Sequence, residues 1–163
     1  MTRLPNRLER RLRARPFVRD QRAASAVEFA IVAAPFFLLI TWLVQLGIFF
    51  VTQVALNNGL IAEAEQIREN LVVGTLPNAA TIKSGVVSST GALIANNSTL
   101  QVELRTLADL DTQSVPIVDG TTDYGTTTSV LVLRASGQVI SFAPGFGSIN
   151  TVTSAALVRR QGS

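Results

Sequence analysis

Residues 22–51 read RAASAVEFAIVAAPFFLLITWLVQLGIFFV, and this stretch decides the fold. The 23 residues from 29 to 51 carry no charge, and Thr41 and Gln45 are the clearly polar ones among them. A helix of about 20 apolar residues spans the hydrocarbon layer of a membrane. A buried helix of a soluble domain would instead show a polar face, and this stretch has almost none. It therefore predicts a transmembrane segment over about residues 29–51.

The positive charge of the chain is concentrated before this segment. Residues 1–22 hold eight arginines against two acids, a net charge of +6, whereas residues 23–163 hold six basic against nine acidic side chains, a net charge of −3. An arginine-rich arm is typical of nucleic-acid binding or of the cytoplasmic side of a membrane helix. The adjoining apolar segment favours the second interpretation, so we expect no nucleic-acid partner, and the arm also suits anionic lipid headgroups. The arginines expected to place the N-terminus of the helix in the cytoplasm are Arg11, Arg13, Arg15, Arg19 and Arg22.

The composition offers little for catalysis. The chain has no cysteine and no histidine, which excludes disulfides, thiol chemistry and the usual zinc sites. Two Asp-rich stretches, residues 109–111 and 119–123, have the composition of turns, and neither has the spacing of an EF-hand loop. No phosphate-binding loop, Ser-His-Asp set or base-stacking pattern is present. We expect no enzymatic activity, no metal and no cofactor.

Helical spacing continues beyond the apolar segment. The apolar positions that recur at roughly helical intervals are Val54, Ile61, Ala64, Ile67 and Leu71. Charged residues return from Glu63 onward, and Gly74 and Pro77 supply stop signals. The pattern predicts one helix of about 45 residues, from near Ala24 to near Val72, with an apolar first half and an amphipathic second half. Pro35 removes one hydrogen bond of that helix and predicts a kink.

The remaining residues predict a small α+β domain. A second, shorter helix is expected to open at residues 77–79, although Gly85 weakens it. The predicted strands cover residues 100–107, with Leu100, Val102 and Leu104 facing inward, residues 129–140, and residues 149–159. Residues 108–127 are expected to form a long loop. Three strands packed on the amphipathic half of the long helix would share one core with it.

Residues 22–30, with Pro35 in the apolar run that follows, resemble the processing motif of the TadE-like proteins. These are minor pilin-like components (pseudopilins) of the tight-adherence (Tad) pilus system of bacteria, within the wider type IV pilin class. Residues 151–159 also resemble the closing strand of TadE-like proteins. The resemblance implies a pilin-like α+β fold: a long N-terminal helix on a small antiparallel sheet. The implied parts are a basic cytoplasmic leader at 1–23, the long helix at 24–73 and an extracytoplasmic domain at 74–163.

The resemblance also implies a processing site. In type IV pilins a prepilin peptidase cuts just before the apolar segment and leaves a glutamate at the fifth position of the mature chain. Here this implies a cut between Ala23 and Ala24, with Glu28 as the fifth residue. Ala23 stands where pilins usually have glycine. The residues implied in assembly and recognition are Glu28, Phe29 and Pro35.

A carboxylate at the start of a membrane helix needs a partner. A cut before Ala24 would create an α-amino group one helical turn from Glu28, in the same or a neighbouring subunit, able to form a charge-assisted hydrogen bond with it. The alternative is an interfacial carboxylate that pairs with Arg19 or Arg22 and favours the helix macrodipole.

The resemblance implies a minor pilin in the bacterial inner membrane that assembles through its helix with major and minor pilins. Its other expected partners are the prepilin peptidase, the pilus assembly platform and the lipid bilayer. Two alternatives stay open. One is an uncleaved single-pass scaffold of an envelope complex. The other is a secreted protein cut after Ala64, where Ala62-Glu63-Ala64 has a small-x-small pattern.

Overall fold

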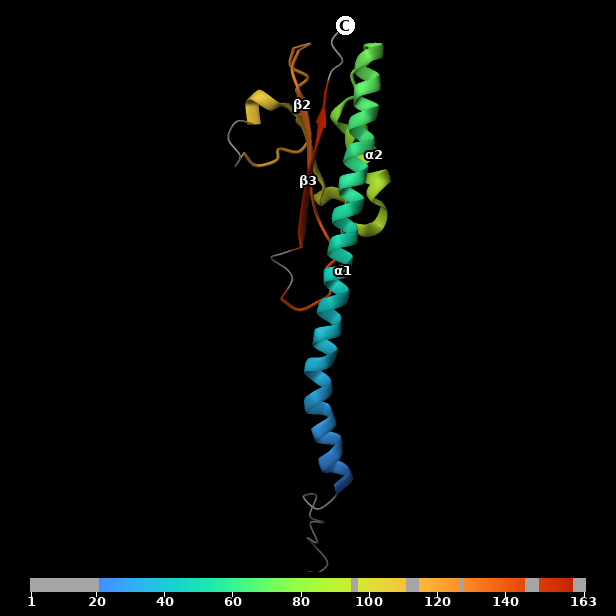
Figure 1. The fold of residues 1–163 in the computed structure, drawn as a ribbon, viewed down its shortest axis with the longest axis vertical. Coiled ribbons are helices and arrows are strands. Elements are labelled where there is room, and N and C mark those ends of the chain that lie inside the picture. The colour runs from blue at the N-terminus through green and yellow to red at the C-terminus, as the bar shows by residue number, and fades with distance from the viewer. Residues whose placement is uncertain (1–20, 95–96, 111–114, 127, 146–149, 160–163) are drawn as a thin grey trace, which may run out of the picture. The chain divides into compact units, whose positions relative to one another are not determined.

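The computed structural model of the chain describes residues 21–94, 97–110, 115–126, 128–145 and 150–159. Four of the arginines expected to orient the helix lie outside the described residues: Arg11, Arg13, Arg15 and Arg19. The chain divides into two compact units at the junction of Ile40 and Thr41. Helix α1, Gln21–Val73, runs through this junction as one helix of 53 residues (Figure 1). The predicted long helix is therefore confirmed, and it begins about one turn before Ala24.

The first unit contains an apolar length of helix whose side chains are exposed. From Ala24 to Ile40 all side chains are exposed except that of Ala33, which is partly buried. One helix of the described residues is long and apolar enough to cross a membrane, and none of its most apolar window is buried. A core helix of a soluble domain would bury one face. The helix continues without a break through Pro35, and the kink expected there stays a prediction.

In the second unit, α1 buries one face against the rest of the domain. The buried positions recur at helical intervals and are Gln45, Thr52, Leu56, Leu60, Ala64 and Ile67. Leu56, Leu60, Ala64 and Ile67 form one core with the sheet and with helix α2, Ala79–Thr90. Figure 1 shows α2 and the strands beside the C-terminal part of α1. The long helix thus supplies one wall of the core of this small domain.

Helix α2 is the predicted short helix. Asn78 caps its N-terminus, because its Oδ1 accepts a hydrogen bond of 2.9 Å from the backbone N–H of Thr81. Ile82 and Val86 are buried in the core. Two glycines permit a close approach of α1 and α2. A β-carbon added at Gly59 on α1 would lie 2.8 Å from Cβ of Ser89, and one added at Gly85 on α2 would meet the Glu63 carboxylate.

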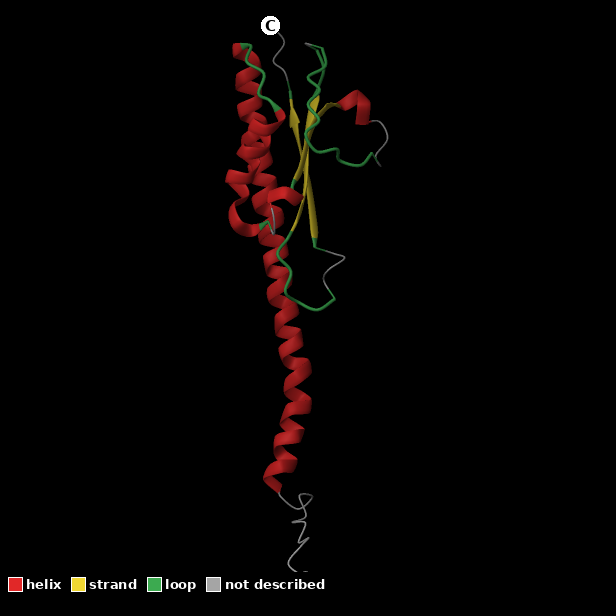
Figure 2. Cartoon of the chain, turned by 180° about the vertical axis from the view of Figure 1, so that it is seen from behind, coloured by secondary structure: helices red, strands yellow, loops and turns green. Residues whose placement is uncertain are grey.

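The sheet has the three antiparallel strands that were expected, and their order in the sheet is β1-β2-β3. Their bounds are β1 Gln101–Thr106, β2 Leu131–Gln138 and β3 Thr151–Val158. Figure 2 shows the strands lying along the helices. Short 3₁₀ turns occupy Gly91–Leu93, Asn97–Thr99 and Leu107–Leu110. The predicted inward residues Leu100, Val102 and Leu104 are all buried.

Part of the predicted loop between β1 and β2 covers the outer edge of the sheet. The Leu104 N–H donates to Thr121 O, and the Asp123 N–H donates to Leu104 O, each at 2.8 Å. Leu104 and Thr122 form a parallel bridge. An exposed strand edge is a site of unwanted pairing with other chains, so this segment protects the free side of β1.

We expect Gly59→Ala to destabilise the domain by about 1–3 kcal/mol, because the new methyl group must push apart the backbones of α1 and α2. Gly47→Ala is the matched control on the same helix, since no atom lies within 4 Å of its added β-carbon. Both changes raise helix propensity by up to about 1 kcal/mol, so the difference between them isolates the close approach. Thermal unfolding of the two detergent-solubilised variants measures this difference in stability. Equal stabilities would show that α2 moves away without cost.

Candidate processing and assembly site

The implied processing site lies in the first turns of α1. Ala23 and Ala24 are the third and fourth residues of the helix as the structure describes it. Glu28 comes one turn after Ala24, since a helix has 3.6 residues per turn. An amine at Ala24 and the carboxylate of Glu28 would therefore lie on the same face of the helix.

Glu28 and Phe29 are both exposed, and Phe29 is 72 % exposed. No hydrogen bond or ion pair joins Glu28 to another side chain in the described part of the chain. The alternative pairing of Glu28 involves Arg19, outside the described residues, or Arg22, whose side chain is not described. In this monomer the carboxylate is thus positioned without a described partner, at the start of an exposed apolar helix.

Gln45 has a structural role that sequence analysis missed. It lies in the predicted membrane segment, yet its side chain is fully buried. Its Nε2 donates a hydrogen bond of 2.9 Å to Ile140 O, and its Oε1 accepts one of 3.1 Å from the Phe142 N–H. Both partners belong to the β2–β3 loop, of which the structure describes residues 139–145 and 150. The sequence does show an isolated amide within an apolar run, which indicates that Gln45 needs a hydrogen-bond partner. The sequence does not identify that partner, because Ile140 lies 95 residues away.

The packed face of α1 begins at Gln45. Residues 45–51 thus belong to the predicted membrane segment and also line the folded domain on one side, where Ile48 and Phe49 pack against the core. Thr52 is buried as well and satisfies its hydroxyl within the helix, donating to Ile48 O at 2.8 Å. The length of α1 with fully exposed apolar side chains therefore lies N-terminal to Gln45.

Glu63 is a buried carboxylate in the contact between α1 and α2. It lies well past the membrane segment, is 6 % exposed and packs against Gly85. Burial raises the pKa of its carboxyl. Glu63 and Ala64 are both buried in the middle of α1. A cut after Ala64 would remove the part of α1 that contributes Leu56 and Leu60 to the core, which argues against the secreted alternative.

The other acidic residues hold loops in place. The Glu103 side chain is buried opposite Arg134 on β2, whose Nε donates to Glu103 Oε1 at 2.6 Å. The other oxygen of Glu103 accepts from the Val118 N–H at 2.8 Å, and Arg134 also donates to Val115 O. This pair therefore fastens residues 115–118 to the sheet. Sequence analysis placed Leu104 inward correctly but did not predict that Glu103 is buried too.

Asp119 and Asp123 act within the loop. Burial tends to raise the pKa of Asp119, but hydrogen bonds from Lys83 at 2.6 Å and from the Val102 N–H outweigh it and lower that pKa. Asp123 accepts from the Gly125 N–H at 2.9 Å, which is the predicted turn-forming role. Asp111 lies outside the described residues.

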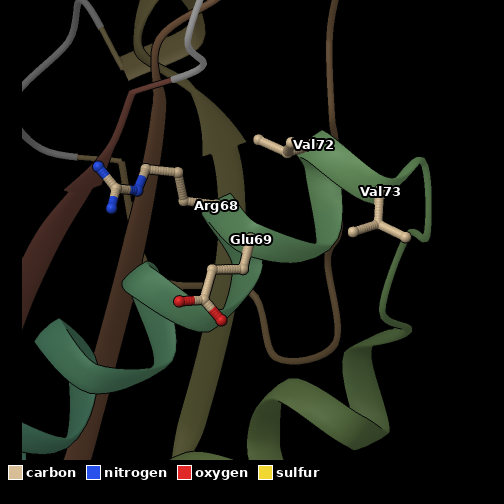
Figure 3. A pocket seen from close by; sticks show the side chains of 4 residues that line it. All are labelled: Arg68, Glu69, Val72 and Val73. Carbon is tan, nitrogen blue, oxygen red and sulfur yellow. The ribbon is translucent and has the colours of Figure 1, made fainter.

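The far end of α1 carries a shallow hollow lined by Arg68, Glu69, Val72 and Val73. In Figure 3 these four side chains point in different directions from the last turns of the helix. Val72 and Val73 are largely exposed, and Arg68 forms a surface ion pair of 2.7 Å with Glu65. The hollow has no convergent polar groups and does not resemble a ligand site.

These observations define a class of protein. It is membrane-anchored and pilin-like, with one helix that is apolar and exposed at first and then packs on a small antiparallel sheet. Within this class, residues 23–61 match the family model described as TadE-like protein, so the resemblance seen in the sequence is confirmed over this part of the chain. The match supports a structural component associated with the Tad pilus. No curated protein and no solved structure matches the chain.

We expect Gln45→Ala to cost about 1–3 kcal/mol, because it removes two partly buried hydrogen bonds and leaves the Ile140 carbonyl and the Phe142 N–H without the partner that Gln45 provides. Gln53→Ala is the matched control, since Gln53 also donates to a carbonyl of the sheet domain, that of Thr153, but at an exposed position. It should cost no more than about 0.5 kcal/mol. Hydrogen exchange at the Phe142 amide should accelerate only in the Gln45 variant. Unchanged protection of that amide would rule out this role of Gln45.

Proposed function

We propose that this protein is a minor pilin of a tight-adherence pilus system, processed by a prepilin peptidase between Ala23 and Ala24. The observation that carries the proposal is the TadE-like match over residues 23–61, which includes Glu28 one turn after the proposed cut. The basic arm would hold the uncleaved N-terminus in the cytoplasm. The domain that follows α1 would then lie outside the inner membrane.

Cleavage would change how the chain is held in the membrane. It would remove residues 1–23, which carry a net charge of +6, and leave a chain whose side chains carry a net charge of −3. Attraction between basic residues and anionic lipids contributes about 1 kcal/mol per charge. Its loss would ease extraction of the helix from the bilayer toward the assembly platform. The new amine at Ala24 would offer Glu28 of the same or a neighbouring subunit a charged partner.

The outer face of α1 supports assembly through the helix. Large apolar side chains recur there at helical spacing and remain exposed in the second unit: Leu46, Phe50, Val54 and Ile61. This stripe lies on residues of α1 other than those that pack on the sheet. Exposed apolar stripes mark contacts with other proteins or with lipid. Major and minor pilins with similar helices are the partners we propose for it.

The mass of the mature protein tests the processing step. Protein isolated from membranes of cells with an active prepilin peptidase should lack residues 1–23 and begin at Ala24. A strain without the peptidase is the control and should yield the full chain. Ala23→Gly should be cut at least as completely, since glycine is the usual residue there. An intact leader in the presence of active peptidase would favour the uncleaved scaffold instead.

Glu28→Ala tests the role of the carboxylate after processing. Because Glu28 is exposed and has no described partner in the monomer, the variant should fold and insert normally. The amount of the variant in sheared pili, or the amount of pili formed if the protein only primes assembly, should fall by at least about tenfold. This is the effect of losing about 1.4 kcal/mol in a charge-assisted hydrogen bond. Glu65→Ala, at another exposed acidic position of α1, is the control. Normal piliation with Glu28→Ala would refute the register role.

A further inference from the structure

We propose that residues 139–145, which follow β2 in the β2–β3 loop, are a second membrane contact, which places Ile140 and Phe142 in the interfacial layer of the bilayer beside Trp42. The inference requires only that α1 spans a bilayer. It does not depend on cleavage or on pilus assembly, so it stands or falls separately from the proposed function.

The loop lies against α1 where the packed face of the helix begins. Gln45 is hydrogen-bonded to both Ile140 and Phe142. One turn earlier on the helix, the Trp42 ring lies beside Gly145, whose added β-carbon would be 3.5 Å from it. Figure 2 shows the described segment that follows β2 running alongside α1. The loop and Trp42 therefore share one level along the helix.

That level is where the membrane surface should lie. N-terminal to Gln45 the helix is apolar, exposed and long enough to span the bilayer: the 21 residues from Ala24 to Val44 extend about 31 Å at 1.5 Å per residue. C-terminal to Gln45 one face of the helix is covered by the domain. Tryptophan is enriched at the boundary between lipid and water, and Trp42, the single tryptophan of the chain, lies at this boundary.

The side chains of the loop suit a lipid surface. Ile140 is 44 % exposed and Phe142 52 % exposed, although both flank a buried hydrogen-bonded amide. The sequence has no charged residue between Arg134 and Arg159, so the loop can enter the interface without carrying a charge into it. Exposed apolar side chains of a loop are costly in water and favourable in the headgroup and acyl boundary.

The backbone of the loop also suits this position. Irregular backbone is tolerated near hydrocarbon only where its polar groups have partners inside the protein. Gln45 supplies an acceptor for the Phe142 N–H and a donor for the Ile140 carbonyl. A glutamine in an otherwise apolar helix is expensive unless it is satisfied. The loop residues Ile140 and Phe142 therefore explain why a glutamine stands at position 45 of an otherwise apolar helix.

Nitroxide labels can test the contact, because the chain contains no cysteine. We would reconstitute full-length Phe142→Cys and Ile140→Cys separately into nanodiscs with one copy per disc. Collision with oxygen, which concentrates in lipid, and with a water-soluble nickel chelate reports the depth of the label. Leu157→Cys is the control, because Leu157 is 67 % exposed and apolar but lies near the opposite end of β3.

The ratio of oxygen to nickel accessibility should be several-fold higher at both loop positions than at Leu157. Equal ratios at the three positions would overturn the proposal and place the loop in water. Shielding of the loop labels only in discs that hold two or more copies would also overturn it, because the loop would then contact another subunit. Circular dichroism of each labelled variant establishes that it is folded before its ratio is compared.

Discussion

The structure depends on one constraint: a single helix must meet two different surroundings along its length. Its hydrogen-bonded backbone allows α1 to cross lipid and then form the wall of a soluble core without a break. The side chains of the helix differ between the two surroundings. They are apolar and exposed before Gln45, and after it they divide into a buried face and an outer stripe. Gln45 is the first side chain of α1 that is buried against the domain, among those that the structure describes.

The domain beyond this point is small and is held at its margins by polar contacts. Three strands and two helices share one core, and a domain of this size buries a modest share of its surface. The Glu103–Arg134 pair and Asp119 fasten the segment that covers β1. On the opposite edge, Gln53 of α1 donates to a carbonyl of β3. Each edge of the sheet therefore has a polar contact from outside the three strands.

Features that depend on local pattern could be predicted from the sequence. The long helix followed from its composition, α2 from the helix start expected at residues 77–79, and the inward face of β1 from alternation of apolar and polar residues. Features that depend on distant partners could not be predicted. Nothing near Gln45 indicates the β2–β3 loop, and nothing near Glu103 indicates Arg134 or Val118. The processing residues were predicted from a sequence motif alone. The fold adds that Glu28 is exposed and lies one helical turn from Ala24.

The buried Glu63 makes the stability of the domain depend on acidity. Because burial raises its pKa in the folded chain, folding favours the protonated carboxyl. The stabilisation is complete below the pKa of the unfolded glutamate, about 4.3, and is lost as the pH rises through the higher folded value. Glu63 therefore adds to the free energy of unfolding in acid, and this contribution is lost towards neutral pH.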